Sequence, residues 1–345
     1  MRCCGRRTRT CRSGVFLGFG LTERLPDLWT FSHAQTKRFA DSSVFGQLFT
    51  AVLRQCTEAG LVGGRRLLVD ATHGEADAAL KSLRAELSPV GSDGDMVTDA
   101  VAAAPPPARP RLALAGPRSG PTPKRKASNA TAVSRSDPDA KLRHKPGHRT
   151  HLVHRAQVAV DPKARVIIAV QAEQATGSEA DALQTLIGWA RFAGHTVAEV
   201  GADAGYASLA SYAKLQALNT TAMIPPQPGA KHAAAEAARE RMRTPAGRDT
   251  AIDRQTHAEG AIAELKHHGI GRSRCRGTRK TQLQLLAAAT AINLKRLLGA
   301  HQTRSHGQTA DNPTSHAIVI ALLDLLARCQ AELHALATTK SSTGS

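Results

Sequence analysis

The spacing of hydrophobic positions changes along the first third of the chain. We expect residues 15–64 to be helical, because apolar side chains recur every four positions from Val44 to Cys56, as on one buried helix face. Residues 65–72 instead hold a short apolar run that ends in a carboxylate. This pattern predicts a buried strand with Asp70 at its tip. Residues 75–89 are predicted to return to helix.

A proline-rich segment separates this part from an alternation of strand-like and helix-like stretches. Residues 102–126 contain seven prolines and six basic residues but no acid, which predicts a solvated linker. The remaining pattern predicts strands at 154–160, 165–173, 197–206 and 221–226, and helices at 181–194, 208–218, 254–269, 280–300 and 316–338. The predicted fold class is therefore α/β, with a mixed sheet and an N-terminal helical part.

These segments suggest four regions. We expect residues 1–14 to be a basic extension and residues 15–64 to be a short N-terminal helical domain. Residues 65–300 would form the central domain, with the linker inserted at about 90–133, and residues 301–345 would be a C-terminal helix and tail.

Net charge identifies the kind of partner. The 345 residues carry a formal charge of +18, which indicates that the binding partner is a polyanion. Aromatic residues make up only 3% of the chain, so base stacking on single strands is not expected to dominate. The six cysteines include no C-x-x-C pair, which argues against a zinc ribbon. The sequence contains no run of 18 apolar residues, so no membrane span is predicted.

Three acids stand out by position. Asp70 and Asp203 each follow a predicted strand, and Glu259 lies on a predicted helix. Carboxylates are the ligands that Mg²⁺ prefers, and two such ions can activate the attacking oxygen and stabilise the leaving oxygen of a phosphoryl transfer. A single Asp after a strand is more often a turn residue, so the hypothesis depends on all three acids together.

Helical geometry then selects the neighbours of Glu259. Lys266 follows it by seven residues, about two turns, and is expected on the same face beside a bound phosphate. Glu264 is about 140° away around an α-helix and is predicted to be a solvated charge. Arg254 precedes Glu259 by five residues, again about 140°, so the spacing gives it no clear place beside Glu259.

The stretch after this helix, KHHGIGRSRCRGTRK, is dense in cations and has no acid. Most such runs are solvated faces, but this one follows the predicted Glu259 helix directly. We therefore expect contacts to the DNA backbone, which carry no sequence information. The candidates in this stretch are Lys266, Arg272, Arg274, Arg276 and Lys280, and Arg254, at the start of the preceding helix, is a sixth. We also expect the three acids to face DNA and to form no ion pairs with the surrounding Lys and Arg side chains.

Several blocks resemble bacterial insertion-sequence transposases of the DDE type, which have a ribonuclease-H-like catalytic core. The resemblance covers roughly residues 15–300 and is carried by these blocks: LTERLPDLWTFSHAQTKRF, GLVGGRRLLVDATHGEADA, SRSDPDAKLRHKPG, VGADAGYAS, RMRTPAGRDTAIDRQTHAEGAIAELKHHGIGRSRCRG and LLAAATAINLKRLL. Asp70, Asp203 and Glu259 match the metal-binding acids of the family. Arg254 and Lys266 match the basic residues of its glutamate-helix signature. The chain departs from the family at Ala251, where a tyrosine is common, and at Gln157, where relatives often carry a histidine.

The resemblance implies a DNA transposase that cleaves and joins DNA using two Mg²⁺ (or Mn²⁺) ions. Its partners would be double-stranded DNA, both transposon ends and target, and further copies of itself in a homodimer or larger assembly. Residues 15–64, as a shortened N-terminal domain of the family, would help to bind this DNA. It would act in the bacterial cytoplasm, associated with the nucleoid. Two alternatives stay open: a catalytically inactive transposase remnant that binds DNA, and a metal-dependent nuclease.

Overall fold

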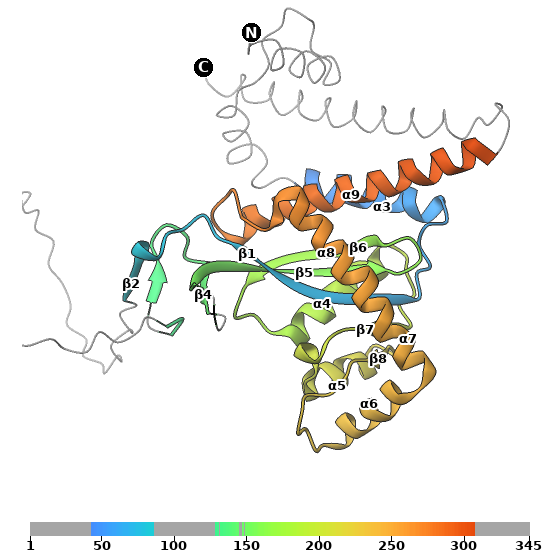
Figure 1. Ribbon diagram of the computed structural model, residues 1–345, viewed down its shortest axis with the longest axis horizontal. Helices are drawn as coiled ribbons and strands as arrows, with labels where there is room; N and C mark the ends of the chain where they lie inside the picture. Colours follow the sequence, from blue (N-terminus) through green and yellow to red (C-terminus); the bar gives the residue numbers. More distant parts are fainter. Residues whose placement is uncertain (1–42, 86–127, 131, 145–146, 148, 308–345) are drawn as a thin grey trace, which may run out of the picture.

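The structure is a computed structural model that describes residues 43–85, 128–130, 132–144, 147 and 149–307 (Figure 1). The predictions for the basic extension, for residues 15–42, for most of the linker and for the helix at 316–338 lie outside these residues.

A six-stranded mixed sheet forms the centre of the described chain (Figure 1). Strand β1 is antiparallel to β5. The other edge of β5 pairs with β4 along its first residues and with β6 along the rest. On the other side, β1 is parallel to β7 and β7 is parallel to β8. The strands are β1 (Arg66–Glu75), β4 (Lys141–Arg143), β5 (His151–Asp161), β6 (Val166–Gln174), β7 (Glu199–Gly201) and β8 (Thr221–Met223). This arrangement confirms the predicted α/β class with a mixed, ribonuclease-H-like sheet.

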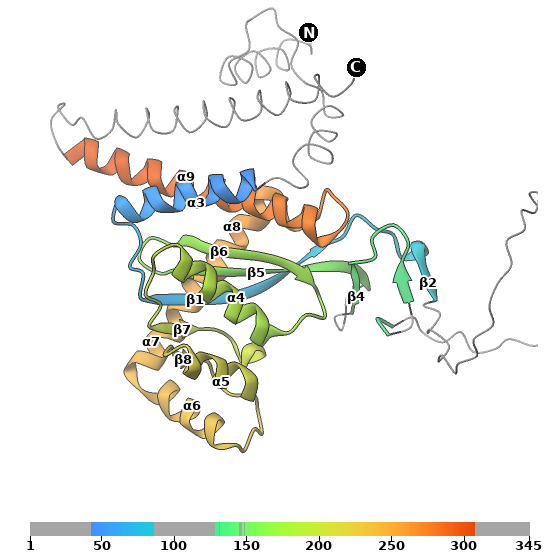
Figure 2. The same cartoon turned by 180° about the vertical axis from the view of Figure 1, so that it is seen from behind.

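Helices cover both faces of the sheet. Figure 1 shows α8 crossing one face, and Figure 2 shows α4 on the other, while α3 and α9 lie side by side next to β6. The helices are α3 (Val44–Glu58), α4 (Glu179–Phe192), α5 (Leu209–Ala217), α6 (Ala233–Arg243), α7 (Pro245–Asp253), α8 (Glu259–Leu265) and α9 (Thr278–Gly307). Two π-helical turns, η3 (Arg254–Ala258) and η4 (Lys266–Ile270), flank α8.

Local chemistry explains the confirmed helices. The predicted stripe of α3 is confirmed in its second half, where Val52 and Cys56 are fully buried. Helix α4 begins at Ser178, whose side chain accepts a hydrogen bond from the Asp181 N–H, as an N-cap does. It ends before Gly194, whose φ of +89° favours glycine.

The prediction of a helix at 75–89 is wrong for the described part of that range. Strand β1 continues to Glu75 because its second half pairs with β5 along the whole edge. A single 3₁₀ turn, η1 (Leu80–Ser82), and strand β2 (Leu83–Ala85) follow, and β2 pairs with β3 (Ala132–Ser134). Asp70 therefore lies in the middle of a strand and not at its tip.

Two further differences concern helices. Helices α6 and α7 were not predicted from the sequence. Helix α9 continues to Gly307, into the region expected to be a polar break.

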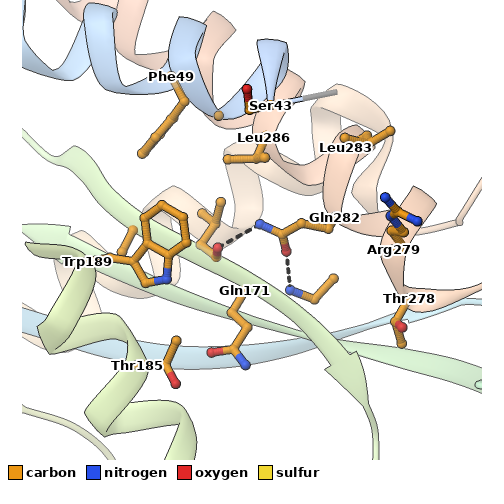
Figure 3. Close-up of a pocket in the computed structure, with 14 residues that line it drawn as sticks. Ser43, Phe49, Gln171, Thr185, Trp189, Thr278, Arg279, Gln282, Leu283 and Leu286 are labelled. Carbon is orange, nitrogen blue, oxygen red and sulfur yellow. Dashed lines mark hydrogen bonds between the residues drawn. The ribbon is translucent and has the colours of Figure 1, made fainter. Parts of the chain in front are cut away.

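Amide side chains from α9 close the outer edge of β6. The Gln282 amide donates to the Val170 carbonyl oxygen at 2.9 Å and accepts from the Ala172 N–H, as the dashed lines in Figure 3 show. Asn293, which is fully buried, accepts from the Ile167 N–H at 2.9 Å and donates to its carbonyl oxygen at 2.8 Å. These side chains take the place of a further strand, so β6 does not expose a free edge at these residues.

Candidate active site

The sheet register brings the two aspartates together. Leu68 of β1 pairs with Gly201 of β7, and Asp70 and Asp203 each lie two residues further along these parallel strands. Asp203 is the N-cap of the 3₁₀ turn η2 (Ala204–Tyr206), and its Oδ1 accepts from the Gly205 N–H at 3.0 Å. Both carboxylates are thus placed just beyond the carboxyl end of β7.

Helix α7, which leads into the helix that carries Glu259, is docked onto this end of the sheet by partly buried polar contacts. Arg66, the first residue of β1, pairs with Glu199 and with Asp253, both at 2.7 Å. The Thr250 hydroxyl also donates to Glu199 at 2.6 Å. These contacts fix α7 directly above β1 and β7, so the following turn lies over the aspartates.

A π-helical turn brings Arg254 beside Glu259. In η3 the Glu259 N–H bonds to the Arg254 carbonyl oxygen, five residues back, so these residues stack on one face. The Arg254 guanidinium lies 3.2 Å from Asp70 Oδ2 through Nη1 and 3.4 Å from Glu259 Oε1 through Nη2. The expectation that the acids form no ion pairs with the surrounding basic side chains is therefore wrong for Asp70 and Glu259. The 140° step failed because it assumed an α-helix.

Asp70 lies in surroundings that disfavour its charge. Burial raises the pKa of its carboxyl group, and the nearby charges of Asp203 and Glu259 raise it further. The Ala71 N–H, at 2.7 Å, and Arg254 act in the opposite direction. The net pKa is raised, chiefly because burial disfavours the charged form of the carboxyl group.

The donor set suits a hard divalent cation, because it consists of carboxylates with excess negative charge. Within the part of the chain that the structure describes, however, no three His, Cys, Asp or Glu side chains form a metal-binding group. One guanidinium is bound to both Asp70 and Glu259, so a cation shared by these carboxylates would have to displace it.

Five of the candidate DNA-contacting residues form a basic strip along η4 and the segment that follows it, at the Glu75 end of β1. Arg272 pairs with Glu75 through a backbone bridge, and Gly74 permits this approach because a Cβ there would lie 2.5 Å from the Ile270 oxygen. Lys266, Arg272 and Arg274 line one hollow of about 410 Å³. Arg276 pairs with Asp77 at 3.2 Å, and Lys280 lies in the first turn of α9.

Glu264 differs from its prediction. Its carboxylate pairs with Arg296 of α9 at 2.5 Å and is 27% exposed, so it connects two helices and is not a solvated charge. The nearby His268 Nε2 lies 2.9 Å from Lys295 Nζ.

Sequence reasoning missed a buried polar network under the acids. Tyr206 and Gln157 are almost fully buried, and the Tyr206 hydroxyl donates to the Gln157 carbonyl oxygen. Burial raises the pKa of Tyr206, and the charges of Asp70 and Asp203 add to this effect. The available signal was Tyr206 itself, an aromatic residue three positions after Asp203 in an otherwise small-residue turn.

A larger cavity of about 570 Å³ lies elsewhere, between α3, α4, α9 and β6 (Figure 3). Its lining includes Phe49, Trp189 and Leu286 and no acid, so it lacks the groups that phosphoryl transfer needs.

Comparison with known proteins identifies one family. The sequence model described as Transposase DDE domain matches residues 121–294, about half of the chain. This range contains Asp203, Glu259 and the basic strip, whereas Asp70 lies before it. No curated protein matches the chain. Within the described residues, no helix is long and apolar enough to cross a membrane.

Proposed function

Since this chain belongs to the family of DDE-domain transposases, we propose that it cleaves the ends of an insertion sequence and joins them to target DNA. The observation that carries the proposal is the placement of three acids: Asp70 and Asp203 each lie two residues past the paired Leu68 and Gly201, and Glu259 comes from a helix laid across these strands. Arg254, bound to Asp70 and Glu259 at once, marks the point where two of these charges meet.

In this proposal Asp70, Asp203 and Glu259 hold two Mg²⁺ (or Mn²⁺) ions. The bound ions would supply Lewis-acid stabilisation of the attacking and leaving oxygens. The side chains of the protein position the ions and the DNA and take no covalent part. Arg254 offsets the carboxylate charge before loading and is then free to contact a phosphate.

The basic strip would hold the DNA backbone. Lys266, Arg272 and Arg274 are exposed and form no ion pair with any described residue, so their charges are available to phosphates. Arg276 and Lys280 extend the strip, and Arg276 would exchange Asp77 for a phosphate. Since two ends must be joined, we propose that a homodimer or larger assembly acts on double-stranded DNA in the bacterial cytoplasm.

The test is cleavage and strand transfer on DNA that carries the element's ends, with Mg²⁺ or Mn²⁺. We expect the unaltered protein to cleave and join, and Asp70→Ala, Asp203→Ala and Glu259→Ala to do neither. Glu240→Ala, which removes an acid that is 77% exposed on α6, is the matched control and should remain active. Cleavage without joining would favour the nuclease alternative. DNA binding without metal-dependent cleavage would favour an inactive remnant.

A further inference from the structure

The second aspartate turn is attached to the sheet through one tyrosine. Tyr206 is the last residue of η2, the turn that Asp203 caps, and only 2% of it is exposed. Its N–H bonds to the Asp203 carbonyl oxygen at 3.2 Å, and its hydroxyl donates to the Gln157 side chain on β5. The backbone at Asp203 is thus tied to the centre of the sheet.

The orientation of Gln157 is fixed by a second contact. Gln157 is fully buried, and its amide nitrogen donates to Glu173 Oε1 at 2.7 Å. The same oxygen accepts from Arg155 Nε at 2.7 Å, and Arg155 also bonds to Glu179 at 3.0 Å. Because the amide nitrogen is engaged by a carboxylate, the carbonyl oxygen of Gln157 faces the Tyr206 hydroxyl and accepts its hydrogen bond.

This network reaches the strand of the first aspartate from the opposite face. Gln157 is the cross-strand partner of Ala71, so these two side chains share one face of the sheet. Asp70 precedes Ala71 and points to the other face, where Arg254 binds it. The bond between Tyr206 and Gln157 therefore sets where the Asp203 turn sits relative to Asp70, independently of Arg254.

We propose that Tyr206 and Gln157 are positioning residues that hold Asp203 in register with Asp70 for metal binding. The expected effect on metal binding rests on the proposed function. The position of Asp203 is a property of the metal-free protein and can be tested without it. Tyr206 is buried and offers almost no surface to DNA, so we expect its effect on metal binding to act through the position of Asp203.

The chain provides a matched control for removing the hydroxyl. Tyr212 is also buried, at 6% exposure, but its hydroxyl donates to the Ile224 carbonyl oxygen, away from the acids. Hydrogen exchange of the peptide containing residues 203–207 should be at least about tenfold faster in Tyr206→Phe than in the unaltered protein, because the turn loses its anchor. Tyr212→Phe should leave that exchange unchanged. Equal exchange in all three proteins would overturn the proposal.

Mn²⁺ binding, measured by calorimetry, gives the second readout. Removing a group that orients a metal ligand typically weakens metal binding about 10–100-fold, so we expect a loss in that range for Tyr206→Phe and Gln157→Leu but not for Tyr212→Phe. Gln157→His keeps an acceptor for the hydroxyl and should recover most of the affinity. Equal Mn²⁺ affinity in the unaltered protein, Tyr206→Phe and Gln157→Leu would overturn the proposal. If the unaltered protein binds no Mn²⁺ that Asp203→Ala abolishes, the proposed function fails, and hydrogen exchange still decides the positioning of Asp203.

Discussion

Replacing Arg254 by methionine tests whether its guanidinium competes with a metal ion. A unit charge pair 3.2–3.4 Å apart interacts by about 5 kcal/mol at an effective dielectric constant of about 20, before desolvation is subtracted. Glu259 is 54% exposed, so that pair contributes only ~0–1 kcal/mol after screening. The pair with Asp70 is less than one-fifth exposed on both sides and contributes more, about 2 kcal/mol, between surface and buried pairs.

A metal ion must offset this stabilisation before it can bind the same carboxylates. Since about 1.4 kcal/mol corresponds to a tenfold change in affinity, we expect Arg254→Met to bind Mn²⁺ at least about tenfold more tightly than the unaltered protein. The metal-free variant should unfold at a lower temperature, and Mn²⁺ should raise its midpoint more than that of the unaltered protein. Calorimetry and thermal unfolding, both without DNA, measure these effects.

Two control variants separate competition from other effects. Arg254→Lys keeps the charge but cannot span two carboxylates, so its gain in affinity should be smaller. Arg248→Met removes an exposed arginine of α7 that donates to a backbone carbonyl and should change nothing. Unchanged or weaker Mn²⁺ binding in Arg254→Met would refute the reasoning.

Three further predictions concern stability, pH and DNA. Asn293→Leu leaves the Ile167 N–H and carbonyl oxygen without their hydrogen bonds to Asn293, which costs about 1–3 kcal/mol for each group. Urea denaturation should therefore show a free energy of unfolding lower by more than ~2 kcal/mol. A decrease of less than half of that would contradict the prediction. Burial, followed by the charges of Arg143, Arg155 and Lys266, lowers the pKa of His73 from 6.5 to about 4. Its folded pKa is below the unfolded one, so stability should fall as the pH drops from 6.5 to 4, and His73→Gln should flatten that decline. Lys266→Ala should reduce the salt dependence of DNA binding by about 0.9 in log–log slope, and an unaltered slope would show that it touches no phosphate.

The elements that could be predicted from the sequence are those specified by local residue patterns and turn residues. The strand pair around Asp161 and the helix ending at Gly194 follow from local patterning and turn chemistry, and both are confirmed. The helix predicted at 75–89 failed because strand pairing with β5, a contact far away in the sequence, extends β1. Tertiary pairing overrides local preference in such cases.

The candidate site shows the same division. The sequence predicts a strand before each aspartate, but the proximity of Asp70 and Asp203 depends on the parallel pairing of β1 with β7, which sets Leu68 opposite Gly201. The pairing of Arg254 with Glu259 depends on a π-helical turn, for which no residue pattern in 254–258 gives a signal. The role of Gln157 depends on cross-strand register, and a one-residue shift would turn it to the other face.

The side chains that close the sheet have a consequence for solubility. The Gln282 and Asn293 amides occupy the outer edge of β6, and Arg241 Nε donates to the Ala222 carbonyl oxygen at 3.2 Å on the outer edge of β8. Exposed strand edges are templates on which other chains add strands and aggregate. Among the described strands, the outer edges of β6 and β8 are protected at these points, so crowding many copies onto one DNA molecule would not by itself join their sheets through these edges. Variants that lose these amides should therefore precipitate before they lose their affinity for DNA.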